Sequence, residues 1–256
     1  LDGKLNDRVY ARDIIHYLPG KYGDFANRNL EWHGDGLANI DMDGRLTMAT
    51  ISAELSAEFS MFPYDDVLAN YLEGRAKKEF EPAFPDEDAE YEMEIHIDLD
   101  SLVPQVVLPN KVAKNVKPVT DVAADKIKVD QAFIGSCANG RLSDFKVAAD
   151  VLNGKKIADG VRMIVTPGSQ AILQEAIKLG YVSTIMEAGA VVTNSTCGAC
   201  FGGHLGLLGD GEVCITASTR NFQGRMGSPS ASVYMGSPAT VAASAIAGVI
   251  ADPRDF

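Results

Sequence analysis

The sequence is poor in cysteine and in positive charge. It has four cysteines in 256 residues, which is too few for a disulfide scaffold and fits a reducing, cytoplasmic compartment. Lysine and arginine number 23 against 35 acidic residues, a net charge of −12, so the basic surface that nonspecific nucleic-acid binding needs is missing. No apolar run is long enough to cross a bilayer. We therefore expect a globular protein with neither a nucleic acid nor a membrane as partner.

Three of the four cysteines form a pattern that indicates metal chemistry. Cys137 lies in Gly-Ser-Cys-Ala-Asn-Gly-Arg, and Cys197 and Cys200 lie in Thr-Cys-Gly-Ala-Cys. Thiolates select zinc or iron–sulfur clusters, and a cubane cluster usually takes four of them. Three ligands leave one iron with an open position, where it can act as a Lewis acid on a substrate oxygen. Cys214, in the apolar stretch Glu-Val-Cys-Ile-Thr, is expected to be a small buried hydrophobe instead.

The second half of the chain alternates short apolar runs with helical patterns. This alternation is typical of an α/β fold with a parallel sheet. The expected strands are Val129–Ile134, Val161–Val165, Ala190–Thr193 and Val213–Ala217, and the expected helices are Asp144–Leu152, Gln170–Leu179 and Pro238–Val249. Ser169 and Ser237 stand where N-caps are expected, and Pro238 suits the first helical position.

The strand positions predict that the three cysteines meet. Cys137 follows the strand that ends at Ile134, and Cys197 follows the strand that ends at Thr193. Ligands gather at the carboxyl ends of the strands in open α/β sheets, so the two segments are expected at one edge. Glycines beside each cysteine permit the backbone angles and the close approach that a bulky cluster needs.

The first half is more mixed. Helices are expected over Val9–Leu18, ended by Pro19-Gly20, over Thr47–Phe59, and over Asp65–Ala76. Tyr91–Leu99 alternates polar and apolar residues, which predicts a half-buried strand. A boundary near residue 123 would divide the chain into an α/β domain over 1–123 and a metal-bearing α/β domain over 124–256.

Residue spacing alone leaves two questions about the site open. His204 lies four residues after Cys200, so Cys137, Cys197, Cys200 and His204 would also make a Cys₃His zinc site in a binding or assembly module. Arg220 and Arg225 lie five residues apart in one loop. A guanidinium group suits bidentate binding of a carboxylate, but both residues could equally be ordinary solvated cations of a surface loop. Glu54 is not distinguished from Glu58 by its spacing.

Four ordered motifs resemble the aconitase superfamily, and within it the family of 3-isopropylmalate dehydratase and homoaconitase large subunits of the archaeal type. They are Gly-Ser-Cys-Ala-Asn-Gly-Arg (135–141), Thr-Cys-Gly-Ala-Cys-Phe-Gly-Gly-His (196–204), Thr-Arg-Asn-Phe-Gln-Gly-Arg-Met-Gly (219–227) and Ser-Pro-Ala-Thr-Val-Ala-Ala-Ser-Ala-Ile-Ala-Gly (237–248). The resemblance extends over the whole chain, more weakly before residue 90. It implies α/β/α domains of the aconitase type.

The resemblance also implies a site. A [4Fe–4S] cluster would be held by Cys137, Cys197 and Cys200, with one labile iron that is easily lost in the purified protein. Arg220 and Arg225 correspond to the arginines that bind substrate carboxylates. Glu54, in Arg-Leu-Thr-Met-Ala-Thr-Ile-Ser-Ala-Glu (45–54), matches an active-site glutamate. His204 corresponds to a family motif position that is not a metal ligand, which weakens the zinc alternative.

The implied reaction is reversible dehydration and hydration of a hydroxy di- or tricarboxylate. The first expectation is 3-isopropylmalate and 2-isopropylmalate in leucine biosynthesis, and the alternative is homoaconitase or another 2-alkylmalate dehydratase. Thr50 and Thr219 stand where the family usually has asparagine, and Ala138 replaces a common threonine. Because both asparagines lie near cluster and substrate in relatives, the two threonines leave the identity of the hydroxy acid open.

The resemblance implies partners as well. Family members carry an N-terminal region with His and Asp-Ser-His motifs, and nothing in this sequence matches it. A small subunit with a swivelling domain supplies a further arginine and the serine that removes the carbon-bound proton. The chain is therefore expected to work in a heterodimer, and to be inactive without that region and that subunit.

Overall fold

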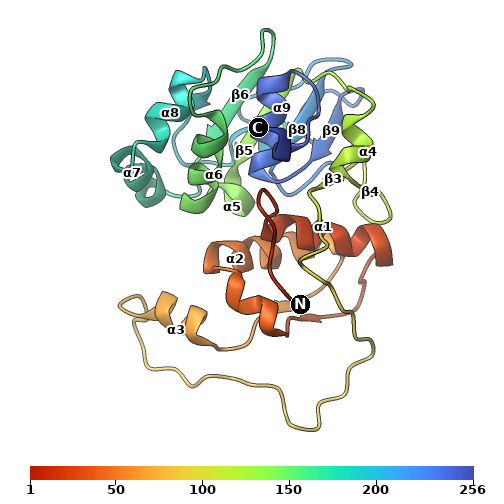
Figure 1. Cartoon of the computed structure of the whole chain (residues 1–256), viewed down its shortest axis with the longest axis vertical. Helices are drawn as coiled ribbons and strands as arrows, with labels where there is room; N and C mark the ends of the chain where they lie inside the picture. The colour runs from red at the N-terminus through yellow and green to blue at the C-terminus, as the bar shows by residue number, and fades with distance from the viewer.

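The computed structural model describes residues 1–256 and has two parts, which Figure 1 shows one above the other. The upper part is built on a seven-stranded sheet in the order β4-β3-β9-β8-β5-β6-β7. Its strands are β3 (Gln105–Val107), β4 (Val116–Pro118), β5 (Gln131–Gly135), β6 (Arg162–Thr166), β7 (Val191–Val192), β8 (Val213–Thr216) and β9 (Ser232–Met235). The strands β5 to β9 pair in parallel, and β3 is antiparallel to both of its neighbours. The α/β class with a mostly parallel sheet is confirmed.

Alternation along the strands gives the sheet two apolar faces. Ala132 and Ile134 belong to a core shared with the helices on one face, whereas Phe133 belongs to a second core with Cys200 and Cys214. The helices of the first face include α4 (Val119–Ala123), α6 (Leu142–Leu152), α7 (Gln170–Lys178), α8 (Tyr181–Glu187) and α9 (Pro238–Ala247). The second face is covered by residues 199–208, which include Cys200 of the C-x-x-C pair, and by Met226 and Ala231.

The lower part has its own hydrophobic core. Its elements are α1 (Ala11–Tyr22), β1 (Leu30–Glu31), α2 (Met42–Ile51), β2 (Ser60–Met61), α3 (Asp66–Leu72) and the 3₁₀ turns η1 (Asp35–Asn39) and η2 (Ser52–Leu55). Ile14, Ile15 and Met48 are buried in this core, which also reaches Ala138 and Met235 of the upper part. The sheet of the upper part takes in residues 105–118, and the division near residue 123 stays a prediction.

Several local predictions are confirmed by their hydrogen bonds. The side chain of Ser169 accepts from the amide of Ile172 at the start of α7, and that of Ser237 accepts from the amide of Thr240 at the start of α9. Other boundaries are wrong. Helix α1 passes through Pro19 and ends three residues later at Tyr22; the next residue, Gly23, has φ 91°, and its amide donates to the Pro19 carbonyl oxygen. Helix α2 begins at Met42, and its continuation η2 ends at Leu55 instead of Phe59.

The predicted strand Tyr91–Leu99 is wrong, although its alternation is real. Ile97 and Leu99 are buried and Asp98 is not, as the pattern predicts. However, the segment pairs only with Asp2, through one isolated bridge, and no neighbouring strand continues the ladder. The alternation therefore reflects an extended segment laid against the lower core.

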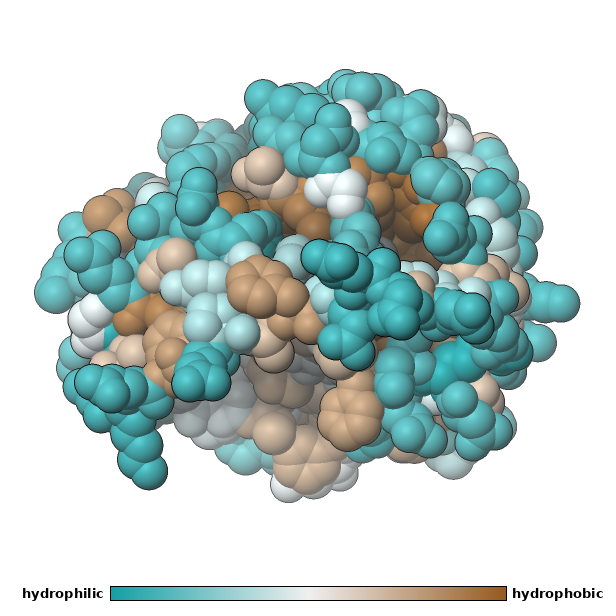
Figure 2. Space-filling model, turned by 90° about the horizontal axis from the view of Figure 1, so that it is seen from below, coloured by the Kyte–Doolittle hydropathy of each residue, from teal (hydrophilic) through white to brown (hydrophobic).

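The lower face of the molecule carries exposed apolar side chains among charged ones. Figure 2 shows this face, with brown and tan residues between teal ones. Exposed large hydrophobic residues of the first half include Phe59, Met61, Phe84 and Met93. None of the helices in the structure has both the length and the apolar character that crossing a membrane requires.

His16, on α1, is a fully buried histidine without a hydrogen-bond partner at either ring nitrogen. Burial, together with the positive charge of Arg12, holds the pKa of His16 well below its usual value. Below about pH 6.5 the unfolded chain therefore binds a proton that the folded chain does not bind. Because the unfolded state takes up more protons there, the free energy of unfolding must fall as the pH drops.

We expect His16→Leu to remove this acid sensitivity. Relative to the unmodified chain, the variant should gain up to about 1.4 kcal/mol in free energy of unfolding for each pH unit below about 6.5. Urea unfolding at about pH 7.5 and about pH 5.5 measures the difference. Burial raises the pKa of Asp13 and of Asp144 to about 7, but both carboxyl groups titrate in both proteins, so the comparison isolates His16. Parallel pH dependences of the two proteins would contradict the assignment.

Candidate functional site

The sheet has a switch point between β5 and β8. The chain runs from β5 outward to β6 and β7, then returns to place β8 on the other side of β5. In an open α/β sheet the crevice beyond the carboxyl ends of two such strands is the usual ligand site. The Cys137 turn follows β5, and Thr219 and Arg220 follow β8. The fold therefore puts two of the predicted site segments on either side of this crevice.

The turn after β5 is strained and tightly packed. Gly135 has φ 146°, and a side chain there would collide with the carbonyl oxygen of Thr166. Ser136 has φ 65°, in the left-handed region that costs a residue with a side chain about 1–2 kcal/mol. Its hydroxyl is buried without a partner, directly before Cys137 in the short helix α5 (Ser136–Asn139). Such strain with an unsatisfied polar group is found where a turn is shaped for a ligand.

The C-x-x-C segment forms a second turn, which also packs against Thr166. Cys200 is 4% exposed in the 3₁₀ turn η3 (Gly198–Cys200), whereas Cys137 and Cys197 are exposed, and all three are free thiols. A Cβ at Gly198 would lie 2.5 Å from the Thr166 hydroxyl, and one at Gly140 would lie 2.7 Å from the Thr166 carbonyl oxygen. Both cysteine turns therefore pack against the end of β6.

We expect Gly198→Ala to disturb this packing. Gly198 has φ 55°, and the added methyl group would also lie 3.0 Å from the Phe133 ring. Gly154→Ala is a matched control, because Gly154 has φ 71° but nothing within 4 Å. Both variants carry the left-handed strain, so the overpacking at Gly198 should cost about 1–3 kcal/mol more in urea unfolding. Equal losses in the two variants would show that the contact with Thr166 has no energetic role.

The buried thiol of Cys200 is surrounded by polar groups. The Nε atom of Arg225 donates to the Cys200 carbonyl oxygen at 2.9 Å, and Nη2 lies 3.7 Å from the Cys200 sulfur. The Thr219 hydroxyl lies 4.0 Å from the same sulfur. Arg225 is further fixed over the ring of Phe222, with its guanidinium 5.4 Å from the ring centroid. The structure thus brings one predicted arginine directly onto one predicted cysteine.

Glu54 and Arg220 form an ion pair across the two parts of the molecule. The Nε atom of Arg220 donates to Glu54 Oε1 at 2.5 Å, between residues 166 positions apart. Glu54 lies in η2 at the end of α2, which explains why it reaches the upper part while Glu58 lies beyond the helix, exposed. Thr50 takes no part in this ion pair: its hydroxyl donates to the Leu46 carbonyl oxygen at 2.7 Å within its own helix.

The two cysteine turns both pack against Thr166, but their three thiols are not grouped into a metal site. No three His, Cys, Asp or Glu side chains are grouped closely enough to hold a metal ion. His204 is exposed, and the structure gives the Cys₃His zinc alternative no support. Cys214 is fully buried, and burial raises the pKa of its thiol to about 12, which confirms it as a small hydrophobe in the core.

Sequence reasoning missed the residues that support the Cys137 turn from below. Asn139 Nδ2 donates to Asp144 Oδ1 at 2.8 Å, and the Arg141 amide donates to Asp144 Oδ2 at 2.9 Å. The Thr47 hydroxyl of α2 donates to the Ala138 carbonyl oxygen at 2.8 Å. Asn139 and Arg141 stand in the motif 135–141, but nothing in the sequence indicates that Thr47 and Asp144 bond to this turn, because both are ordinary helical residues.

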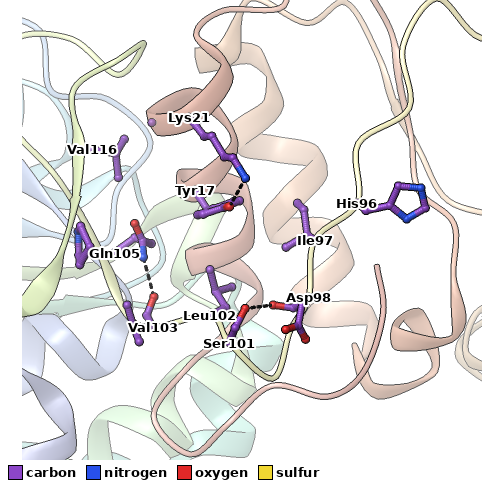
Figure 3. Close-up of a pocket in the computed structure, with 12 residues that line it drawn as sticks. Tyr17, Lys21, His96, Ile97, Asp98, Ser101, Leu102, Val103, Gln105 and Val116 are labelled. Atoms are coloured by element: carbon purple, nitrogen blue, oxygen red, sulfur yellow. Dashed lines mark hydrogen bonds between the residues drawn. The ribbon is translucent and has the colours of Figure 1, made fainter.

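A cavity that could take a ligand lies elsewhere. It has a volume of about 480 Å³ and is bounded by α1, the 96–105 segment and β4. Figure 3 shows Tyr17 and Lys21 on one side of it and His96 and Asp98 on another. It contains none of the predicted site residues. A second cavity, of about 330 Å³, lies between the two parts and is lined by Arg12, Thr47, Asn139 and Asp144 among others.

Comparison with known proteins agrees with the motifs. A model of the aconitase family (aconitate hydratase) matches residues 1–248. Over 254 residues the chain is 52% identical to the 3-isopropylmalate dehydratase large subunit of Mycolicibacterium smegmatis, covering 99% of this chain and 60% of the relative. It is 45% identical over 259 residues to 3-isopropylmalate dehydratase large subunit 2 of Archaeoglobus fulgidus, covering 100% of this chain and 62% of the relative. The chain thus spans about three fifths of the length of these relatives.

Proposed function

The chain belongs to the aconitase family, and from this we propose that it acts as a hydro-lyase, within the large subunit of a 3-isopropylmalate dehydratase. The reaction would interconvert 3-isopropylmalate and 2-isopropylmalate by dehydration and rehydration in leucine biosynthesis. The names of the relatives support the substrate. The observation that carries the proposal is the Glu54–Arg220 ion pair. Arg220 follows β8 at the same sheet edge as the turn with Cys137, which we call the cysteine-bearing edge. An acid–base group and a carboxylate-binding group there suit a hydroxy acid.

The residues that would hold a [4Fe–4S] cluster are Cys137, Cys197 and Cys200. They supply the right donor atoms, on two turns that both pack against Thr166. The buried, unpartnered hydroxyl of Ser136 beside Cys137 is a further group that a cluster would satisfy. Holding the cluster requires the three thiols to come closer together than they lie now. When bound, a cluster with one open iron position supplies a Lewis acid for the substrate hydroxyl.

Arg220 and Arg225 would bind and orient the substrate carboxylates. Each guanidinium can make two parallel hydrogen bonds to a carboxylate, which fixes both its position and its plane. The Cys200 carbonyl oxygen and the Phe222 ring already hold the guanidinium of Arg225, so the position of its Nη atoms is fixed before substrate binds. Arg220 is about half exposed, and its side chain is free to exchange one carboxylate partner for another. Orientation of this kind lowers the entropic part of the barrier.

Glu54 would exchange a proton with the substrate hydroxyl. In the free chain Arg220 Nε donates a hydrogen bond to Glu54 Oε1. A substrate carboxylate that takes over Arg220 would leave Oε1 open to the hydroxyl group of the same substrate, and so couple binding to catalysis. The proton on carbon would be removed by a residue of a small subunit. That partner is proposed because the relatives are named large subunits.

Turnover after assembly tests this function. The full-length protein that carries this sequence should be prepared without oxygen, reconstituted with iron and sulfide, and combined with a candidate small subunit. We expect turnover of 2- and 3-isopropylmalate, with homocitrate and other 2-alkylmalates as comparison substrates because Thr50 and Thr219 replace family asparagines. Full cluster content without turnover of any hydroxy acid would overturn the proposal. Faster turnover of homocitrate would move it to homoaconitase.

A further inference from the structure

Arg12 is a buried cation that extends from the lower part of the molecule to the cysteine-bearing edge. It lies in the first turn of α1 and is 1% exposed. Its Nη1 atom donates to Asn139 Oδ1 at 2.5 Å and to the Ala217 carbonyl oxygen, and its Nη2 atom donates to the Ser218 carbonyl oxygen. These partners are at least 127 positions away in the sequence.

The contacts of Arg12 join the two sides of the switch point. Asn139 ends the turn that contains Cys137 and follows β5. Ala217 and Ser218 follow β8 and lead directly to Thr219 and Arg220. One planar guanidinium therefore fixes the spacing between a ligand-bearing turn and a substrate-binding segment. A single lysine ammonium lacks the planar array of donors that reaches three acceptors in this way.

Arg12 also remains charged in its buried position. Burial lowers the pKa of Arg12 to about 10, while the negative charges of Asp13, Asp144 and Cys200 oppose that change. The group is thus a cation at neutral pH. Its Nε–H is buried without a partner. A buried charge with an unsatisfied donor is costly, so its contacts at the site edge must hold it in place.

We propose that Arg12 is a positioning residue, which holds the Cys137 turn and the Thr219–Arg220 segment in register with Cys200. The proposal rests on the function proposed above and deepens it, because this register sets how the Cys137 turn faces the carboxylate-binding Arg220. Arg12 touches neither substrate nor reacting atoms in this role. Its effect is to make the geometry of the upper edge depend on α1 of the lower part.

Arg45 is a matched control for Arg12. It is also 1% exposed, and it donates to the Ile40 and Leu37 carbonyl oxygens and to Asp65. All of these partners lie in the lower part of the molecule. Loss of Arg45 should therefore cost stability through the same kind of interaction, without loosening either segment of the cysteine-bearing edge.

Two buried thiols allow local and global opening to be separated. Cys200 is 4% exposed at the site, and Cys214 is 0% exposed in the middle of β8. The reduced, metal-free full-length protein is treated with iodoacetamide, and labelling of each cysteine is followed by peptide mass spectrometry. We expect Arg12→Met to raise the labelling rate of Cys200 relative to Cys214 at least tenfold, because the loss of hydrogen bonds to a charged group favours local opening.

Arg12→Lys tests geometry apart from charge. It keeps the cation but loses the planar donors, so the ratio of Cys200 to Cys214 labelling should be intermediate. Arg45→Met should lower the urea midpoint and leave that ratio unchanged. An unchanged ratio in both Arg12 variants, or equal acceleration of both thiols, would overturn the proposal, and the lysine variant decides it should the methionine variant fail to fold. Iron and sulfide content of the unmodified chain tests the cluster separately, since the labelling ratio needs no metal.

Discussion

Cys137→Ser is expected to abolish the binding of iron and acid-labile sulfide, whereas Cys214→Ala is not. Cys137 is the only thiol on the turn after β5, so its loss leaves just the C-x-x-C pair as protein ligands. A cubane cluster that already lacks a fourth cysteine would then be held at two of its four irons. Because Cys137 is exposed and forms no disulfide, its replacement should leave the fold intact. The expected result is loss of nearly all of the cluster.

The measurement is iron and sulfide per chain after anaerobic reconstitution, with circular dichroism as the check on folding. Cys214→Ala removes a buried sulfur from the core of the same sheet, so it controls for general loss of packing. It should keep its iron even if its urea midpoint falls. Retention of a full cluster by Cys137→Ser would remove Cys137 from the ligand set and contradict the site proposed here.

Glu54→Gln is expected to lower kcat by about 10²–10⁴-fold, the usual contribution of a general acid–base group. The amide keeps the size of the side chain but cannot exchange a proton, and it weakens the ion pair with Arg220. Because Arg220 becomes freer to meet a substrate carboxylate, KM should not rise in parallel. The loss should therefore be concentrated in kcat.

Glu58→Gln is the control for this prediction. It lies four residues further on and is exposed. Steady-state kinetics of both variants with the assembled, cluster-loaded enzyme measure the difference. A Glu54→Gln variant with an unchanged kcat would assign Glu54 a structural role, as the anchor of Arg220 between the two parts.

Local interactions made some of the fold predictable from the sequence. Ser169 and Ser237 cap their helices through bonds to an amide three residues away, so the sequence contains all the information needed. The helix end predicted at Pro19 was wrong because a proline near the end of a helix removes only one amide donor. Helix α1 continues to Tyr22 and stops before Gly23, whose φ is positive. The strand Ser232–Met235 was not predicted, since its 4 residues are at the lower limit of length at which alternation indicates a strand.

The site was predictable in its parts but not in its supports. Glycine-flanked cysteines at strand ends led to the sheet edge, where the structure does bring the two turns against Thr166. Arg12, Thr47 and Asp144 were missed because each is an ordinary helical residue, and their partners lie far away in the sequence or are defined only by burial. The bonds of Arg12 and Thr47 are long-range, and such bonds leave no periodic signal that a sequence pattern detects.

The ligand chemistry of the three cysteines is the claim from which the rest follows, and metal analysis of the unmodified protein tests it most directly. The protein is purified without oxygen, and its iron, acid-labile sulfide and zinc are determined per chain. We predict about four irons and four sulfides after reconstitution, or three irons once the labile one is lost. One zinc per chain with no sulfide would contradict the account.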